Sequence, residues 1–274
     1  MTSQSVVPDV RFDEVNVGSG LRLHYAEQGP RDGEAVVCLH GFTDSWFSFS
    51  RVLPLFPEDW RVIVPDQRGH GESSRPIGGY SMKQFAQDAL DLMDALGIER
   101  ATIVGHCMGS IVGQYMAAMA PNRVSRLVLA ASCASTRQEP VLQLREIVDT
   151  LEDPVPLDFI VDFQTSTVHQ APPQDFLSTV FQESAKLPAR VWKSVLADFL
   201  NAEPDHAAIR CPALLLWGDR DFFPFEEQEV LLRAIPNARL HVENGVGHSM
   251  QWEVPETFVR EVSAFVALTS AARV

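Results

Sequence analysis

The chain has 274 residues, 46% hydrophobic and 21% charged, a composition typical of a globular protein with one large core. Its formal net charge of −14 argues against nucleic acid or an anionic membrane as a partner. No apolar run approaches the roughly 18 residues of a membrane span, and residues 1–10 lack the features of a signal peptide. The four cysteines are scattered singly: Cys38, Cys107, Cys133 and Cys211. We therefore expect a reduced, cytoplasmic protein.

The first half of the chain alternates short apolar runs with amphipathic segments. Residues 11–17 and 21–27 alternate apolar and polar side chains, which predicts a hairpin around Gly18, Ser19 and Gly20. Helices are predicted at 81–96, which Gly97 ends, and at 110–120, which Pro121 ends. Continuous apolar runs predict buried strands at 35–39, 61–64, 101–104 and 126–131.

The alternation lapses at residues 135–205, where helical stretches are broken by prolines and contain several aromatic residues. It then resumes with a strand at 213–217, a helix at 226–234, a strand at 239–242 and a helix at 255–267. Buried strands that alternate with helices predict an α/β fold, a mostly parallel, doubly wound sheet with helices on both faces. We therefore predict a core domain of residues 1–134 and 206–274, interrupted by a helical cap of residues 135–205.

A predicted strand, a sharp turn and a predicted helix meet at Cys107. Gly105 and Gly109 flank this residue in the pattern Gly-x-nucleophile-x-Gly, the nucleophile elbow. Glycine suits both positions because the nucleophile takes a strained conformation and the strand and helix pass too close for a Cβ atom. Serine is the usual central residue, so the sequence predicts an unusual cysteine nucleophile.

Five motifs in this order resemble the α/β-hydrolase fold with a helical cap, in particular its esterase and lactonase branch. The resemblance covers nearly the whole chain outside the cap. No dinucleotide-binding motif or metal-ligand spacing accompanies it, so we expect a small-molecule substrate and no cofactor. The motifs are His40-Gly41-Phe42, Asp66-x-Arg-Gly-x-Gly-x-Ser, the elbow, Gly218-Asp219-Arg220-Asp221 and Gly247-His248.

The resemblance implies a catalytic triad in the chain order nucleophile, acid, histidine. Cys107 takes the first place and His248, in a glycine-rich turn before the last helix, takes the third. The loop after the next-to-last strand offers two acids, Asp219 and Asp221. The pattern Gly-x-x-Asp-x-x-Pro favours Asp221, with Asp219 as a loop-capping or surface carboxylate.

The family also implies an oxyanion hole of two backbone N–H groups, from Phe42 and from Met108, the residue after the nucleophile. Several aromatic residues crowd the first of these positions, and Phe42 and Trp46 are expected to contact the substrate. The predicted substrate contacts also include His106, which adjoins the nucleophile.

Sulfur at the elbow restricts the chemistry. A nearby imidazole and a helix N-terminus lower the pKa of a thiol, so we predict a thiolate–imidazolium pair of Cys107 and His248. Haloalkane dehalogenases and epoxide hydrolases of this fold use Asp at the elbow, so both classes are excluded. Dienelactone hydrolases use Cys there but lack a long cap. Cys107 is either the native nucleophile or a replacement for serine.

These features predict a hydrolase that cleaves a mainly apolar carboxylic ester or lactone through a Cys107 thioester. Three alternatives stay open: an acyltransferase that uses the same thioester, a C–C bond hydrolase, and a hydrolase-like receptor for a small molecule. The sequence indicates neither the particular substrate nor the oligomeric state.

Overall fold

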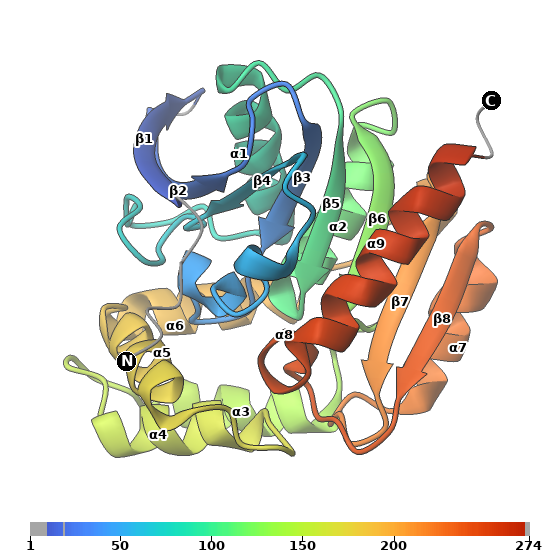
Figure 1. Ribbon diagram of the computed structural model, residues 1–274. Coiled ribbons are helices and arrows are strands. Elements are labelled where there is room, and N and C mark those ends of the chain that lie inside the picture. Colours follow the sequence, from blue (N-terminus) through green and yellow to red (C-terminus); the bar gives the residue numbers. More distant parts are fainter. Residues whose placement is uncertain (1–9, 19, 272–274) are drawn as a thin grey trace, which may run out of the picture.

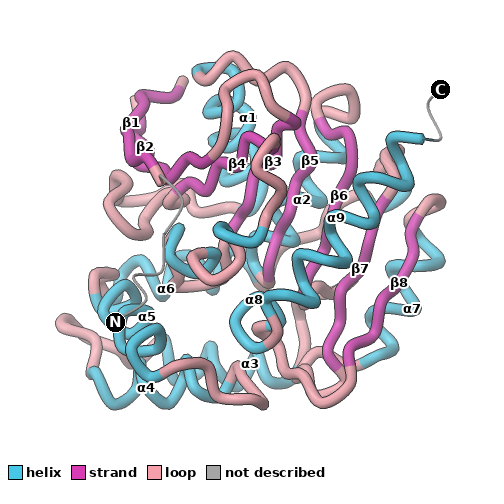
Figure 2. The backbone as a smooth tube through the Cα atoms, in the orientation of Figure 1, coloured by secondary structure: helices cyan, strands magenta, loops and turns pink. Residues whose placement is uncertain are grey.

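The structure is a computed structural model that describes residues 10–18 and 20–271. Residues 1–9, where no signal peptide is predicted, and Ser19 of the predicted turn lie outside the described residues. Figure 1 shows a central twisted sheet with helices on both faces, and Figure 2 shows the same layers by secondary structure. None of the helices in the described ranges combines the length and the apolar character that a membrane crossing requires.

Eight strands form the sheet in the order β1-β2-β4-β3-β5-β6-β7-β8. β2 pairs antiparallel with β1 and with β4, whereas all other neighbours are parallel. This confirms the predicted hairpin and the mostly parallel sheet. The strands are β1 (Arg11–Val17), β2 (Leu21–Gln28), β3 (Glu34–Leu39), β4 (Trp60–Pro65), β5 (Ala101–His106), β6 (Val124–Ala130), β7 (Ala213–Gly218) and β8 (Ala238–Glu243).

The central strands are apolar on both faces, so successive residues pack into two different cores. In β3, Val37 and Leu39 join the core under helices α1 (Met82–Ala95) and α2 (Met108–Met119). Val36 and Cys38 of the same strand join the core on the other face, which α9 (Pro255–Ala271) covers. The continuous apolar runs in the sequence reflect this burial on both sides.

The ends of α1 follow the predicted signals. The side chain of Ser81 accepts a hydrogen bond from the backbone N–H of Gln84 at the first turn. Gly97 follows the helix with φ +66°, a left-handed conformation that glycine adopts without a steric penalty. The remaining helix on that side of the sheet is α7 (Phe225–Ala234), and the short α8 (Met250–Glu253) precedes α9.

Four helices lie between β6 and β7 in the chain. They are α3 (Glu139–Val148), α4 (Leu157–Ser166), α5 (Gln174–Ala185) and α6 (Ala189–Phe199). Figure 1 shows them together beyond the edge of the sheet where the arrows of the parallel strands end. In an open α/β sheet, ligands bind at the carboxyl ends of the strands, so these helices lie over the expected site.

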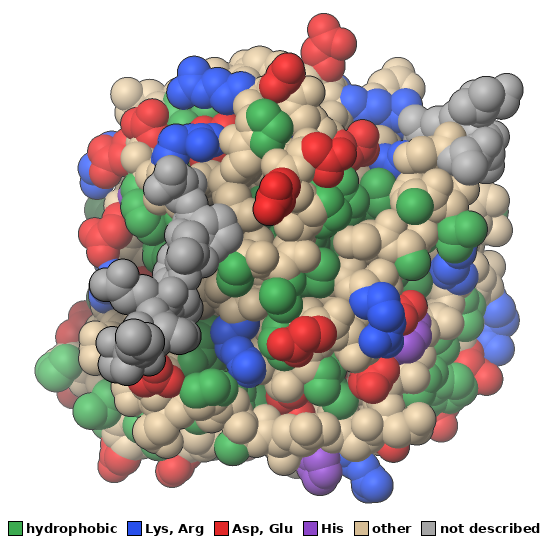
Figure 3. Space-filling view, in the orientation of Figure 1, with side chains coloured by type: hydrophobic (Ala, Val, Ile, Leu, Met, Phe, Trp, Pro, Cys, Tyr) green, Lys and Arg blue, Asp and Glu red, His purple; other side chains and the backbone are tan. Residues whose placement is uncertain are grey.

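The surface in Figure 3 has no single-charge field. Acidic, basic and hydrophobic side chains are interspersed over the face that α9 crosses.

Candidate active site

Cys107 stands at the turn between β5 and α2 with φ 50° and ψ −116°, a strained conformation for a residue with a side chain. The neighbouring glycines are required by close contacts. A Cβ atom on Gly109 would lie 2.0 Å from the carbonyl oxygen of Leu39, and one on Gly105 would lie 2.3 Å from that of Gly109. The backbone therefore has the elbow geometry that the motif predicts, and it presents the thiol at the N-terminus of α2.

Two loops at the same edge of the sheet bring His248 and Asp221 together. Asp221 follows β7 and His248 follows β8, and these strands are parallel neighbours. Nδ1 of His248 lies 2.8 Å from Oδ1 of Asp221, which also accepts a hydrogen bond from the backbone N–H of Phe223. Asp219 instead accepts a hydrogen bond from the backbone N–H of Gly245.

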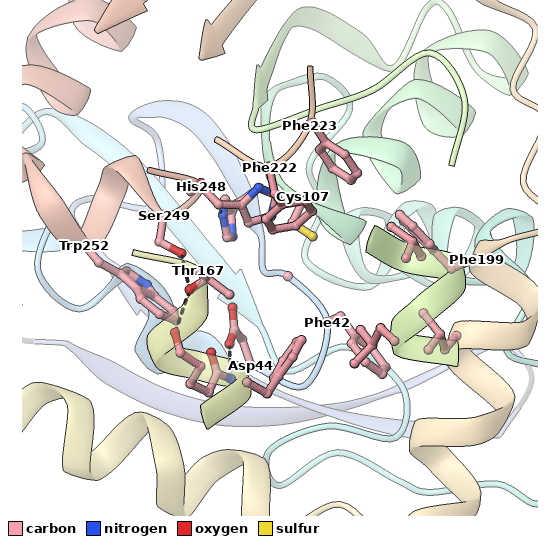
Figure 4. A pocket seen from close by; sticks show the side chains of 17 residues that line it. Phe42, Asp44, Cys107, Thr167, Phe199, Phe222, Phe223, His248, Ser249 and Trp252 are labelled. Atoms are coloured by element: carbon pink, nitrogen blue, oxygen red, sulfur yellow. Dashed lines mark hydrogen bonds between the residues drawn. The ribbon is translucent and has the colours of Figure 1, made fainter. Parts of the chain in front are cut away.

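The imidazole of His248 is buried, with 3% of its side chain exposed. Burial lowers its pKa, but the charges of Asp221 and Cys107 and the hydrogen bond to Asp221 outweigh burial and raise the pKa to about 10. The Asp221 contact fixes Nδ1, so Nε2 is the nitrogen left to exchange a proton with a reacting group. Figure 4 shows Cys107 and His248 at the same cavity.

The loop after β3 passes directly beside the elbow. A Cβ atom on Gly41 would lie 3.3 Å from the Cβ of Cys107 and 3.0 Å from Nδ1 of His106. Phe42 follows, and Thr43 has φ 65°, so the chain turns sharply here. Met108 is the first residue of α2, where backbone N–H groups have no partner within the helix. The N–H groups of Phe42 and Met108 thus belong to the two segments that adjoin Cys107.

A cavity opens onto these residues (Figure 4). Most of its lining is apolar, and none of the described residues that line it is Lys or Arg. Residues of α3, α4 and α6 contribute alongside the loops of the sheet. The lining consists of Gly41, Phe42, Asp44, His106, Cys107, Val141, Leu144, Phe163, Gln164, Thr167, Leu196, Phe199, Phe222, Phe223, His248, Ser249 and Trp252.

Phe42 and His106 line the cavity as predicted contacts would, whereas Trp46 does not. The ring of Trp46 packs against Phe12 and Phe47, because the short helix that it begins turns its side chain toward β1. Trp46 therefore lies outside the cavity lining that the structure describes, and its contact with the substrate stays a prediction. Nε2 of His106 donates to the backbone carbonyl of His248, and burial lowers the pKa of His106 well below its ordinary value.

Several lining residues were missed by sequence reasoning. The ring of Phe222 stacks on His248 with centroids 4.1 Å apart, and the backbone carbonyl of Thr167 accepts a hydrogen bond from the His248 N–H. Asp44 is a buried carboxyl in the same cavity. Its position two residues after the His40-Gly41-Phe42 motif was the available signal.

The described residues show no grouping of three or more His, Cys, Asp or Glu side chains that could hold a metal ion.

The fold and the loops around the elbow define a class, the α/β hydrolases. The family model described as alpha/beta hydrolase fold matches residues 34–164. The chain belongs to this family and is an enzyme.

Relatives of this chain include proteins named as hydrolases. The chain is 32% identical over 277 residues to 2-hydroxy-6-oxononadienedioate/2-hydroxy-6-oxononatrienedioate hydrolase 2 of Pseudomonas putida. The alignment covers 93% of this chain and 96% of the relative. A hydrolase from Pseudomonas aeruginosa PA01 has a TM-score of 0.82 and 25% identity, over 93% of this chain and 98% of that chain. The enol-lactonase from Burkholderia xenovorans LB400 shares the fold, with a TM-score of 0.75 and 23% identity, over 93% of this chain and 100% of that chain.

Proposed function

We propose that the protein hydrolyses a carboxylic ester or lactone through a thioester on Cys107. His248 serves as general base and acid, Asp221 orients it, and the backbone N–H groups of Phe42 and Met108 form the oxyanion hole. The observation that carries the proposal is the strained Cys107 at the elbow, in the same cavity as a His248 whose Nδ1 is held by Asp221.

The reaction follows from these roles. His248 holds the proton of the Cys107 thiol while the sulfur attacks the carbonyl carbon, and the two N–H groups stabilise the negative oxygen of the tetrahedral intermediate. The C–O bond of the substrate breaks, and His248 gives a proton to the departing alcohol oxygen. A water molecule then attacks the thioester and gives a proton to His248, and the carboxylic acid leaves as the C–S bond breaks.

We further propose that residues 135–205 act as the cap that encloses the substrate. The cap residues Leu144, Phe163 and Phe199 contribute apolar surface to the cavity, which suits an apolar acyl or alcohol group. Cys38, Cys107 and Cys133 form no disulfide in the described part of the chain, as expected in a reducing cytoplasm.

A second candidate is hydrolysis of a C–C bond next to a carbonyl, as the name of the Pseudomonas putida relative indicates for that protein. That relative is named for dioates, which carry two carboxylates. The cavity described above has no Lys or Arg among its lining residues, and it contains the carboxyl group of Asp44. Burial of a second negative group beside Asp44 is unfavourable, so the lining favours an uncharged ester or lactone.

The test is a comparison of kcat/KM for uncharged phenyl esters, uncharged lactones and a 2-hydroxy-6-oxo dienedioate. The proposal predicts higher values for the ester or the lactone, with the acid as product. A higher value for the dienedioate would support the C–C hydrolase instead. Stimulation of turnover by an added amine or alcohol, with the acylated amine or alcohol as product, would support acyl transfer.

A further inference from the structure

Asp44 places a carboxyl group inside a cavity that is otherwise mostly apolar. Only 4% of the residue is exposed, and it lines the cavity together with Cys107 and His248. A Cβ atom on Gly41 would lie 3.0 Å from Oδ2 of Asp44 and 3.3 Å from the Cβ of Cys107. The carboxyl group and the nucleophile therefore flank the same glycine, and Figure 4 shows Asp44 reaching into the cavity from another side than His248.

Protein donors hold this carboxyl group in place but leave it acceptor capacity. Oδ2 accepts a hydrogen bond from the hydroxyl of Ser48 at 3.2 Å, and Oδ1 accepts one from Nε2 of Gln164 at 3.2 Å. An ionised carboxylate has about four acceptor positions. Gln164, Ser48 and the backbone of Gly41 supply three donors, so at least one acceptor position remains for a bound molecule.

No basic residue among the described lining residues is free to pair with ionised Asp44. Burial raises its pKa to about 7, although hydrogen bonds from Gln164 and Ser48 and the charge of His248 lower it in part. His248 is already paired with Asp221, and the described lining contains no Lys or Arg. A buried carboxyl group without a counter-charge is stabilised when a bound molecule supplies a hydrogen-bond donor.

We propose that Asp44 is a specificity-determining residue that accepts a hydrogen bond from a hydroxyl or amino group of the substrate. This inference rests on the proposed function and narrows its substrate class to esters or lactones that carry such a donor at a distance from the scissile carbonyl. Gln164, on α4, then positions the carboxyl group from the cap side, and Ser48 positions it from the core side.

The test uses a series of phenyl esters of straight-chain acids that differ by one methylene and end in a hydroxyl, a methoxy or a methyl group. The hydroxyl and methoxy ends both accept hydrogen bonds, but only the hydroxyl donates one. The parent enzyme is expected to prefer the hydroxyl ester over the methoxy ester by about tenfold or more in kcat/KM at one chain length. In Asp44→Asn this ratio falls toward one. In Asp162→Asn, which changes an exposed carboxylate on α4, the parent ratio is retained.

The parent enzyme alone can overturn the inference. It does so if it hydrolyses the esters with a ratio of kcat/KM, hydroxyl ester to methoxy ester, near one at every chain length. Binding separates this failure from failure of the proposed function. The matching methyl ketones, which end in hydroxyl or methoxy groups, are titrated calorimetrically into Cys107→Ala. If one hydroxyl ketone binds more tightly than the methoxy ketone of the same length, the subsite is supported even if no ester is hydrolysed. Equal binding of the two ketones at every length contradicts the subsite.

Discussion

Nδ1 of His248 lies 2.8 Å from Oδ1 of Asp221, although 27 positions separate the two residues in the chain. The parallel pairing of β7 with β8 explains the contact, because both loops leave the same edge of the sheet. The contact fixes which imidazole nitrogen remains for proton transfer, so it links the sheet topology directly to the proposed chemistry.

The two acids of this loop differ in their partners, which gives a matched pair of variants. Asp221→Asn is expected to lower kcat/KM by about 10⁴-fold, because the amide cannot hold His248 in the required tautomer. Asp219→Asn is expected to have a far smaller effect, since it contacts the Gly245 N–H and not His248. Steady-state kinetics on the ester that the parent hydrolyses best provides the measurement. A larger loss in Asp219→Asn would reassign the acid.

The charge state of His248 can be followed by NMR. The charge of Asp221 raises the pKa of this group more than any other interaction, and the charge of Cys107 comes next. The pKa of His248 is therefore expected to fall from about 10 in both Cys107→Ala and Asp221→Asn, with the larger fall in Asp221→Asn. The measurement is the pH titration of its ring proton resonances. An unchanged value in both variants would exclude the proposed coupling.

Crowding at the elbow predicts a large loss of stability in Gly109→Ala. The new methyl group would meet the backbone of Leu39 at 2.0 Å, which forces strand and helix apart, so unfolding free energy should fall by about 3 kcal/mol. Gly78→Ala is the control, because nothing lies within 4 Å of its added Cβ atom. Denaturant unfolding measures both variants. Equal stability of the two would show that the elbow tolerates a side chain.

Asp44 makes the stability of the protein depend on pH in a defined direction. Its pKa is raised from an ordinary value near 4 to about 7, so the folded state holds this proton more tightly than the unfolded state. The stability that this bound proton adds to the folded state is fully present below pH 4. It is lost as the pH rises to about 7, and the free energy of unfolding falls by up to about 4 kcal/mol.

Asp44→Asn removes this titration. The variant should therefore gain stability relative to the parent as the pH rises from 4 to 8. Denaturant unfolding at several pH values gives the difference. A difference that stays constant over this range would mean that Asp44 does not titrate as described.

The sequence predicts the sheet well because its signals are local. The buried runs, the hairpin and the ends of α1 follow from neighbouring residues, and the structure confirms them. The elbow was recognisable for the same reason. Gly105 and Gly109 are required by close contacts between one strand and the helix that follows it, and with the adjacent end of β3.

The cavity lining was harder to predict because distant segments make it. The hydrogen bond between Asp44 and Gln164 joins residues 120 positions apart, and no pattern in the sequence predicts it. Trp46 also shows the limit of a local signal. It stands in an aromatic run near the predicted oxyanion hole, but composition does not reveal that its ring packs against Phe12.

The most direct test of the account is the mass of the intact protein after brief mixing with a small activated ester and an acid quench. A Cys107 nucleophile predicts one added acyl group on the parent enzyme and none on Cys107→Ala, with the label mapped to Cys107 by peptide digestion. It also predicts that the label disappears at the rate at which the acid is released. Acylation of Cys107→Ala to the same extent as the parent, or equal turnover by both proteins, would contradict the central claim that Cys107 is the nucleophile.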